Sequence, residues 1–171
     1  MIVLKAVNLP DFHAIRSATL LATGTLLAVI SLLSGLFMHE SVWRTSWVLG
    51  AIFMSKVVLH WPAIFDLSAL SAAFLALGLV SVTYVAILAW LILPWNWNRA
   101  ALAGSVWGLV CYGVNLYVLT TWFPWLTSER SWMGLAGHLL FGVVAALVLK
   151  AQTERDRGIG ADGPDNQKGV R

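Results

Sequence analysis

Four long apolar runs, separated by short polar stretches, dominate the chain and predict four membrane-spanning helices. They cover residues 17–37, 67–93, 100–123 and 132–149, and none contains Asp, Glu, Lys or Arg. A helix needs about 20 apolar residues to cross the hydrocarbon core of a bilayer. Pro124 ends the third run and Lys150 ends the fourth. The pattern therefore predicts an all-α integral membrane protein with four transmembrane helices in a bundle.

The stretch between the first two runs is apolar but carries charge, so its position is ambiguous. Apolar residues recur there at steps of three and four, which indicates one helical face: Trp43, Trp47, Ala51, Met54, Val58 and Trp61. We expect a helix over about 42–61 that lies at the membrane interface or dips into it, with a fifth crossing as the alternative. Arg44, Lys56 and His60 would contact lipid headgroups or extend towards them.

The placement of basic residues favours four crossings over five. Cytoplasmic segments carry an excess of Lys and Arg. With four crossings both termini are cytoplasmic, and Arg44, Lys56 and Arg130 lie outside. The residues that then lie inside are Lys5, Arg16, Arg99, Lys150, Arg155 and Arg157. With five crossings, Lys5 and Arg16 would move outside.

Composition agrees with a membrane protein. Hydrophobic residues make up 59% of the chain and charged residues 11%, whereas soluble domains carry about 25% charged residues. Most of the ten tryptophans lie near the ends of apolar runs, where aromatic belts form at headgroup depth. Residues 1–150 are expected to form one transmembrane helical domain. The polar, Gly- and Asp-rich residues 151–171 are expected to be a disordered cytoplasmic tail.

Small residues mark one face on each of the last two spans. Gly104 and Gly108 form a GxxxG step, and Gly134 and Gly142 lie on a face that repeats every four residues and includes His138. Small residues let helix backbones approach closely in lipid, where the hydrophobic effect does not drive helices together. The four glycines are therefore candidate helix-packing positions.

Asn115 and His138 are the candidate polar pair inside the membrane. Asn115 shares the face of Gly104, and His138 shares the face of Gly142. Each lies roughly 10 Å below the short hinge, at about 1.5 Å per residue. Neighbouring antiparallel helices would let the two side chains meet. Polar residues can simply join membrane helices, or an ionisable one can mark a functional site; both interpretations stay open.

No feature of the sequence predicts an enzyme. The spans contain no pair of carboxylates, and the chain has no HExxH motif and no phosphate-binding glycine loop. One cysteine, Cys111, excludes an internal disulfide. His60 is the only other histidine near membrane depth besides His138, so we expect no haem, no other cofactor and no metal. Glu129 and Arg130 in the hinge are expected to be a solvated pair.

The C-terminal half of the chain resembles a known family. Its features are a G-x-x-x-Y-x-x-N-x-Y stretch at Gly108, Tyr112, Asn115 and Tyr117, then Phe123-Pro124-Trp125, Arg130, and His138 before Phe141-Gly142. These features resemble the YagU-like small bacterial inner-membrane proteins, some of which carry the label of sodium:proline symporter. The resemblance implies a four-helix bacterial inner-membrane protein without an established activity. A histidine expected near the start of the second span is absent, since residues 71–74 read SAAF.

Two functional classes follow from these observations. The first is a non-enzymatic accessory or structural membrane component that acts through its helix faces. The alternative is a small oligomeric transporter or channel, with Asn115 and His138, and also Tyr84 and Tyr117, lining a polar path. The expected surroundings are the lipid bilayer, and the expected partner is a larger membrane protein complex or further copies of the chain. The net charge of +3 comes from outside the spans and does not indicate nucleic acid binding.

Overall fold

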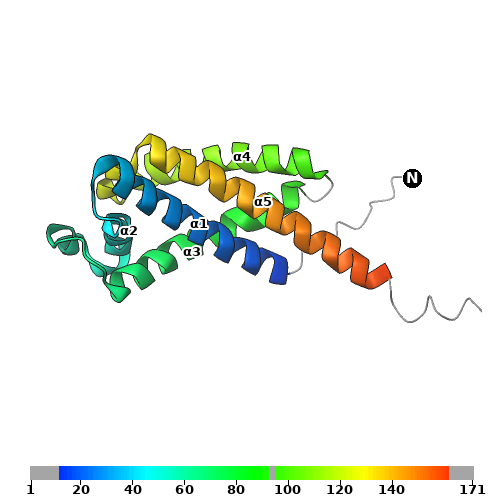
Figure 1. Cartoon of the computed structure of the whole chain (residues 1–171), viewed down its shortest axis with the longest axis horizontal. Helices are drawn as coiled ribbons and strands as arrows, with labels where there is room; N and C mark the ends of the chain where they lie inside the picture. Colours follow the sequence, from blue (N-terminus) through cyan, green and yellow to red (C-terminus); the bar gives the residue numbers. More distant parts are fainter. Residues whose placement is uncertain (1–11, 93–94, 162–171) are drawn as a thin grey trace, which may run out of the picture.

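Four long helices build the protein, as the sequence predicts (Figure 1). The computed structural model describes residues 12–92 and 95–161, and within these ranges it contains helices and loops but no strand. The long helices are α1 (Phe12–Met38), α3 (Leu67–Ile92), α4 (Trp97–Gly113) and α5 (Trp132–Ala161). Two short turns, η2 (Val114–Val118) and η3 (Leu119–Thr121), extend α4 to Thr121. Each of the four helices is long and apolar enough to cross a membrane.

The helix ends differ from the apolar runs by a few residues, for local reasons. α1 already begins at Phe12, and α4 begins at Trp97 because the Asn96 side chain accepts a hydrogen bond from the Arg99 backbone N–H at 3.0 Å. α5 continues to Ala161, so the prediction of a disordered tail from residue 151 is wrong for residues 151–161. Lys150 and Glu154 form an ion pair of 3.6 Å one turn apart in this extension, which supports helix continuation. Residues 162–171 of the predicted tail lie outside the described ranges.

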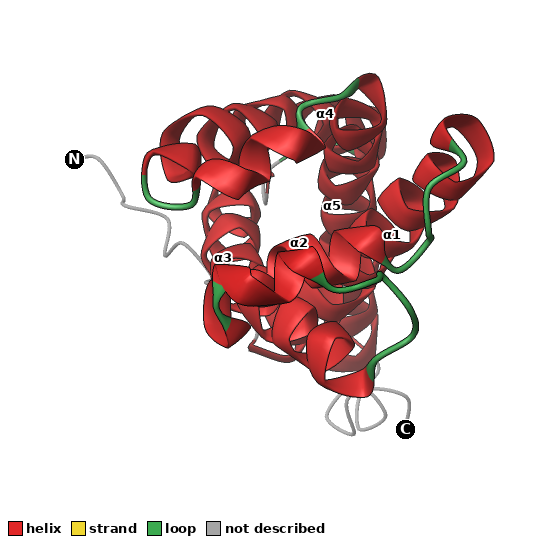
Figure 2. Ribbon diagram, turned by 90° about the vertical axis from the view of Figure 1, so that its left-hand side faces the viewer, coloured by secondary structure: helices red, strands yellow, loops and turns green. Residues whose placement is uncertain are grey.

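The segment before α3 is not one helix. It consists of α2 (Arg44–Met54) and the 3₁₀ helix η1 (Lys56–His60), separated at Ser55, whose φ of 83° no helix tolerates. The predicted continuous helix over 42–61 is therefore wrong. With 11 residues, α2 is about 16 Å long, roughly half of the hydrocarbon core, so the alternative of a fifth crossing is also wrong. Figure 2 shows α2 lying across one end of the long helices.

Two indole hydrogen bonds attach α2 and the loop after it to the rest of the bundle. The Trp47 indole N–H donates to the Ile64 carbonyl at 2.9 Å, and the Trp125 indole N–H donates to the Val48 carbonyl at 3.2 Å. Trp125 belongs to η4 (Pro124–Glu129), the short helix that connects α4 to α5. The connection between α4 and α5 therefore packs on α2, which lies far from it in sequence.

The closest helix pair is α4 with α5, and glycine makes this closeness possible. A Cβ atom on Gly104 or Gly108 would overlap the backbone of Gly142 or His138, and a Cβ on Gly142 would overlap the backbone of Gly104. Gly134 lies elsewhere, against the Glu129 carbonyl oxygen in the hinge. Three of the four predicted packing glycines therefore line the contact between α4 and α5, and the fourth supports the hinge.

The two ends of the bundle differ in charge. The end covered by α2 is balanced, with Arg44, Lys56 and Arg130 against Glu40, Asp66 and Glu129. At the opposite end, the described side chains up to residue 155 are mostly basic, with Arg16, Arg99, Lys150 and Arg155 against Glu154. This asymmetry matches the excess of Lys and Arg on the cytoplasmic side of membrane proteins.

Candidate functional site

A chain of hydrogen bonds joins three helices in the middle of the bundle. The His138 Nδ1 atom lies 2.7 Å from the Gly134 carbonyl oxygen, and its Nε2 atom lies 3.2 Å from the Asn115 side-chain nitrogen. The Tyr84 hydroxyl donates to the Asn115 side-chain oxygen at 2.8 Å. The two side chains that the sequence spacing placed near each other are thus in contact. Tyr84 on α3 joins them as a third member.

The partners of His138 fix which nitrogen carries its proton. A carbonyl oxygen can only accept a hydrogen bond, so Nδ1 donates to the Gly134 carbonyl. In the neutral ring Nε2 is then an acceptor, and the Asn115 amide supplies the N–H. The imidazole can therefore be neutral with both nitrogens satisfied. Binding a second proton at Nε2 would require the Asn115 amide to turn over.

Asn115 lies on a rare backbone element. Residues Val114–Val118 form a π-helical turn, in which the Leu119 N–H reaches the Val114 carbonyl five residues back. Turns of this kind are uncommon and occur frequently at functional sites. The extra residue shifts the end of the span relative to the glycine face of α4. No motif of single residues in the sequence indicates such a turn.

Arg130 holds the irregular end of α4 in place. Its Nε donates to the Leu116 carbonyl at 2.6 Å, and its guanidinium donates to the Thr120 hydroxyl at 2.9 Å. The same guanidinium lies 4.5 Å from the centre of the Tyr117 ring, within the range of a cation–π contact. The predicted solvated pair of Arg130 with Glu129 is therefore wrong, because Arg130 is bound to η2 and η3 and Glu129 is buried.

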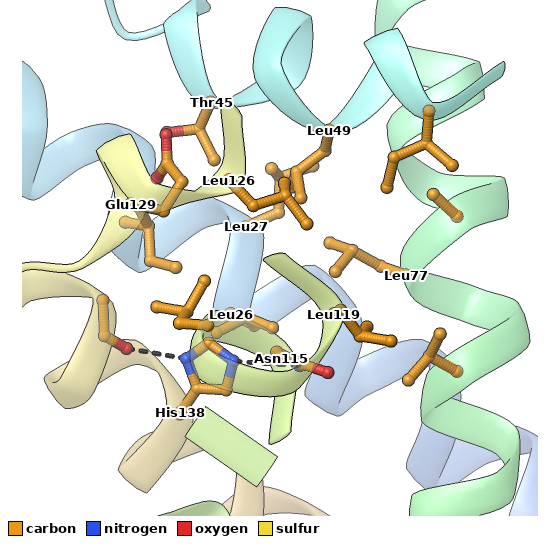
Figure 3. Close-up of a pocket in the computed structure, with 16 residues that line it drawn as sticks. Leu26, Leu27, Thr45, Leu49, Leu77, Asn115, Leu119, Leu126, Glu129 and His138 are labelled. Atoms are coloured by element: carbon orange, nitrogen blue, oxygen red, sulfur yellow. Dashed lines mark hydrogen bonds between the residues drawn. The ribbon is translucent and has the colours of Figure 1, made fainter. Parts of the chain in front are cut away.

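His138 and Asn115 border a cavity of about 60 Å³ between the helices (Figure 3). Three of the long helices, α1, α3 and α5, contribute to its wall together with α2 and the short helices η2, η3 and η4, and the wall is mostly carbon. His138 and Asn115 lie on one side, and Glu129 and Thr45 lie on another (Figure 3). A single water needs about 10–15 Å³, so the cavity has room for small molecules of that size. Two titratable side chains, His138 and Glu129, therefore share one cavity.

Glu129 is the member of the site that the sequence did not indicate. Its side chain is buried, and this burial raises the pKa of Glu129 to about 7. The charge of Arg44 and a hydrogen bond from the Thr45 side chain act in the opposite direction, while Glu40 raises the pKa further. Arg44 forms an ion pair with Glu40 at 3.1 Å, so its charge is already partly neutralised. Burial therefore favours the neutral, protonated form of the Glu129 carboxyl group.

Most of the other candidate residues lie on the surface. Lys56 and His60 are exposed on η1, on the side where headgroups would be expected, and Arg44 is held by Glu40. Tyr117 is 58% exposed on the outside of α4 and does not reach the cavity. Cys111 is buried in the core. Within the described residues, no cluster of three or more His, Cys, Asp or Glu side chains could hold a metal ion.

Replacing Tyr84 by Phe is expected to lower the free energy of unfolding by about 0.6–1 kcal/mol. The substitution removes one side-chain hydrogen bond inside the membrane and leaves the ring in place. Unfolding in a mild detergent, followed by intrinsic fluorescence, measures the change. Tyr117→Phe is the matched control, since Tyr117 is outside the chain of hydrogen bonds; an equal loss in both variants would contradict the role of Tyr84.

No protein-family model, curated protein or solved structure matches the chain. The resemblance to the YagU-like family therefore stays a prediction from the motif residues.

Proposed function

We propose that the protein is a four-span protein of the bacterial inner membrane that acts by binding, as a non-enzymatic accessory or structural component. Four helices of sufficient length and apolarity support the location. The mostly basic end, where α1 begins and α5 ends, supports cytoplasmic termini. The sequence and the arrangement of the site supply no nucleophile with an adjacent base, which is the usual signature of covalent catalysis.

The observation that carries the proposal is the closed chain of hydrogen bonds from Gly134 to Tyr84. Its side-chain donors and acceptors are paired with one another, although His138 and Asn115 also line the cavity. A transport path would instead present unpaired polar groups to water. Tyr117, the fourth residue that could line such a path, lies outside the bundle. The polar residues therefore support a helix-joining role.

The outward apolar faces are the surfaces left for binding. The glycine face of α4 is already covered by α5, so a partner helix cannot use it. The exposed face of α4 carries large apolar side chains instead: Leu102, Val106, Leu109 and Val110. A partner complex or a second copy of the chain would contact residues of this kind.

A second candidate is a path for protons or small solutes, and one observation favours it. Glu129 and His138 line the same cavity, and the pKa of Glu129 lies near 7. Titratable groups that line one cavity inside a membrane protein are a common feature of proton relays. The path would run from the end covered by α2 through Glu129 to His138.

Purification from native membranes in a mild detergent, with identification of the accompanying proteins by mass spectrometry, tests the binding proposal. We expect a stoichiometric membrane partner. Replacing Leu109 by Trp on the outward face of α4 should reduce its recovery, and Leu20→Trp, on the exposed side of α1, is the matched control. Recovery of the chain alone, as a monomer, would contradict a role in a larger complex.

Replacing His138 by Ala separates the two candidates. Under the binding proposal the variant loses about 1–2 kcal/mol of stability, because the Asn115 N–H is left without its acceptor. Wild type and variant should then both fail to move protons in vesicles containing a pH-sensitive dye. The path would be favoured instead if wild type and the Leu109→Ala variant conduct protons and the His138→Ala variant does not.

A further inference from the structure

A groove of about 540 Å³ separates α3 from α4 at the basic end of the bundle. Its floor includes the fully buried Leu88 and the partly buried Ala103. Arg99 and Trp95 stand at its outer end, and both are exposed. The remaining lining side chains are Leu91, Leu102, Val106 and Trp107. Among the described residues, the groove is therefore apolar along its length, and Arg99 is the one cation in its lining.

The groove ends near the middle of the bundle. There the Trp107 indole N–H donates to the Tyr84 carbonyl at 3.1 Å, and the two rings meet edge to face at 6.4 Å between centres. This contact bridges α3 and α4. From Arg99 to Trp107 is eight residues, or about 12 Å along the helix. The depth is therefore close to one leaflet of the hydrocarbon core, which is about 30 Å thick in total.

The charge at the mouth suits an anion. Within the described residues Arg99 forms no ion pair, whereas Lys150 at the same end is paired with Glu154. Other basic side chains, Arg16 and Arg155, lie at this end too. The cytoplasmic leaflet contains anionic lipids, which attract basic segments at the membrane surface. Guanidinium groups bind phosphate through two parallel hydrogen bonds.

We propose that this groove binds one anionic phospholipid, with its phosphate on Arg99 and an acyl chain along α3 and α4. The depth favours a lipid over a protein helix, because a transmembrane helix spans both leaflets and would meet the Trp107–Tyr84 bridge. The acyl chain of the lipid would fill the space between α3 and α4 that the described side chains leave open. This proposal requires the protein to lie in the bilayer. It applies whether the protein acts by binding a partner or by forming a path for protons or small solutes.

The test measures lipid bound to the purified chain and the stability that lipid confers. Membrane fractionation first establishes that the chain is in the bilayer. Native mass spectrometry of the detergent-solubilised protein is expected to show one phospholipid per chain. Adding dioleoyl phosphatidylglycerol to delipidated protein should raise the unfolding temperature more than phosphatidylcholine does, and inorganic phosphate alone should have no effect.

Two pairs of variants make the test specific. Arg99→Gln should abolish the preference for phosphatidylglycerol, while Arg16→Gln, which removes an exposed charge at the same end, should keep it. Val106→Trp should block the groove and remove the bound lipid, while Leu109→Trp, equally exposed on α4 but outside the lining, should not. Equal effects of both lipids on wild type would overturn the proposal. A Val106→Trp variant that keeps its lipid would also overturn it. So would a Val106→Trp variant that loses self-association, because a second copy of the chain would then be the occupant of the groove.

Discussion

Replacing Gly142 by Ala is expected to lower the free energy of unfolding by about 3 kcal/mol, among the largest effects of any single methyl group in this protein. The new Cβ would overlap the Gly104 carbonyl and approach the Gly108 backbone nitrogen to 2.9 Å. Both obstacles are backbone atoms, which cannot rotate away as a side chain can. Overpacking of this kind typically costs about 1–3 kcal/mol, and here α4 and α5 must separate to relieve it.

The measurement is reversible unfolding in mixed detergent micelles, with Gly78→Ala as the matched control. A Cβ on Gly78, in the middle of α3, meets no atom within 4 Å. Alanine is favoured over glycine in a helix interior by roughly 1 kcal/mol, so the control should be neutral or stabilised. A Gly142→Ala variant as stable as Gly78→Ala would mean that the α4–α5 contact is looser than described.

Replacing Glu129 by Gln is expected to stabilise the protein by about 3 kcal/mol above neutral pH and to have no such effect at acidic pH. The folded pKa of Glu129, about 7, lies above the ordinary value of 4.5, so the folded state binds its proton more tightly than the unfolded state. Stability from this group is therefore complete below pH 4.5 and is lost as the pH rises through 7. Each unit of difference corresponds to 1.36 kcal/mol, and glutamine removes the ionisation.

Unfolding midpoints of wild type and variant between pH 4.5 and 8.5 measure this dependence. The two curves should nearly meet at pH 4.5, diverge between pH 4.5 and 7, and keep a constant separation at higher pH. Glu154→Gln, which alters an exposed carboxylate, should keep the wild-type slope. Arg44→Gln should move the fall in stability to higher pH, since the charge of Arg44 lowers the pKa of Glu129. Parallel curves for wild type and Glu129→Gln would show that the carboxyl group is solvated.

The long helices could be predicted because their signal is local. The length of an apolar run can be read from consecutive residues, and it indicated four helices. Apart from the extension of α5, the observed helix ends differ from the predicted ones by only a few residues. The spacing of Gly104, Gly108 and Gly142 likewise depends only on helix periodicity. The break at Ser55 had no such signal, because neither Gly nor Pro marks it. A residue at positive φ that is not glycine is imposed by packing, and packing is not visible in a local pattern.

The site could be predicted only in part, for the same reason. Asn115 and His138 lie on adjacent helices joined by a short hinge, so spacing alone placed them together. Glu129 is buried because η4 and α2 pack together, and Thr45 lies 84 positions before it. Tyr84 reaches Asn115 from a third helix. Contacts between elements distant in sequence decide both cases, and the local pattern of a single sequence contains no record of them.

The π-helical turn at Val114–Val118 also has a consequence for inheritance. Such a turn amounts to one residue inserted into an ordinary helix, and deleting one residue there would rotate the end of the span by about 100°. Leu116 and Thr120 would then move out of hydrogen-bond distance of the Arg130 guanidinium, which binds both. Descendants of the same ancestral gene should therefore keep or lose the inserted residue and the arginine together, as a single heritable unit.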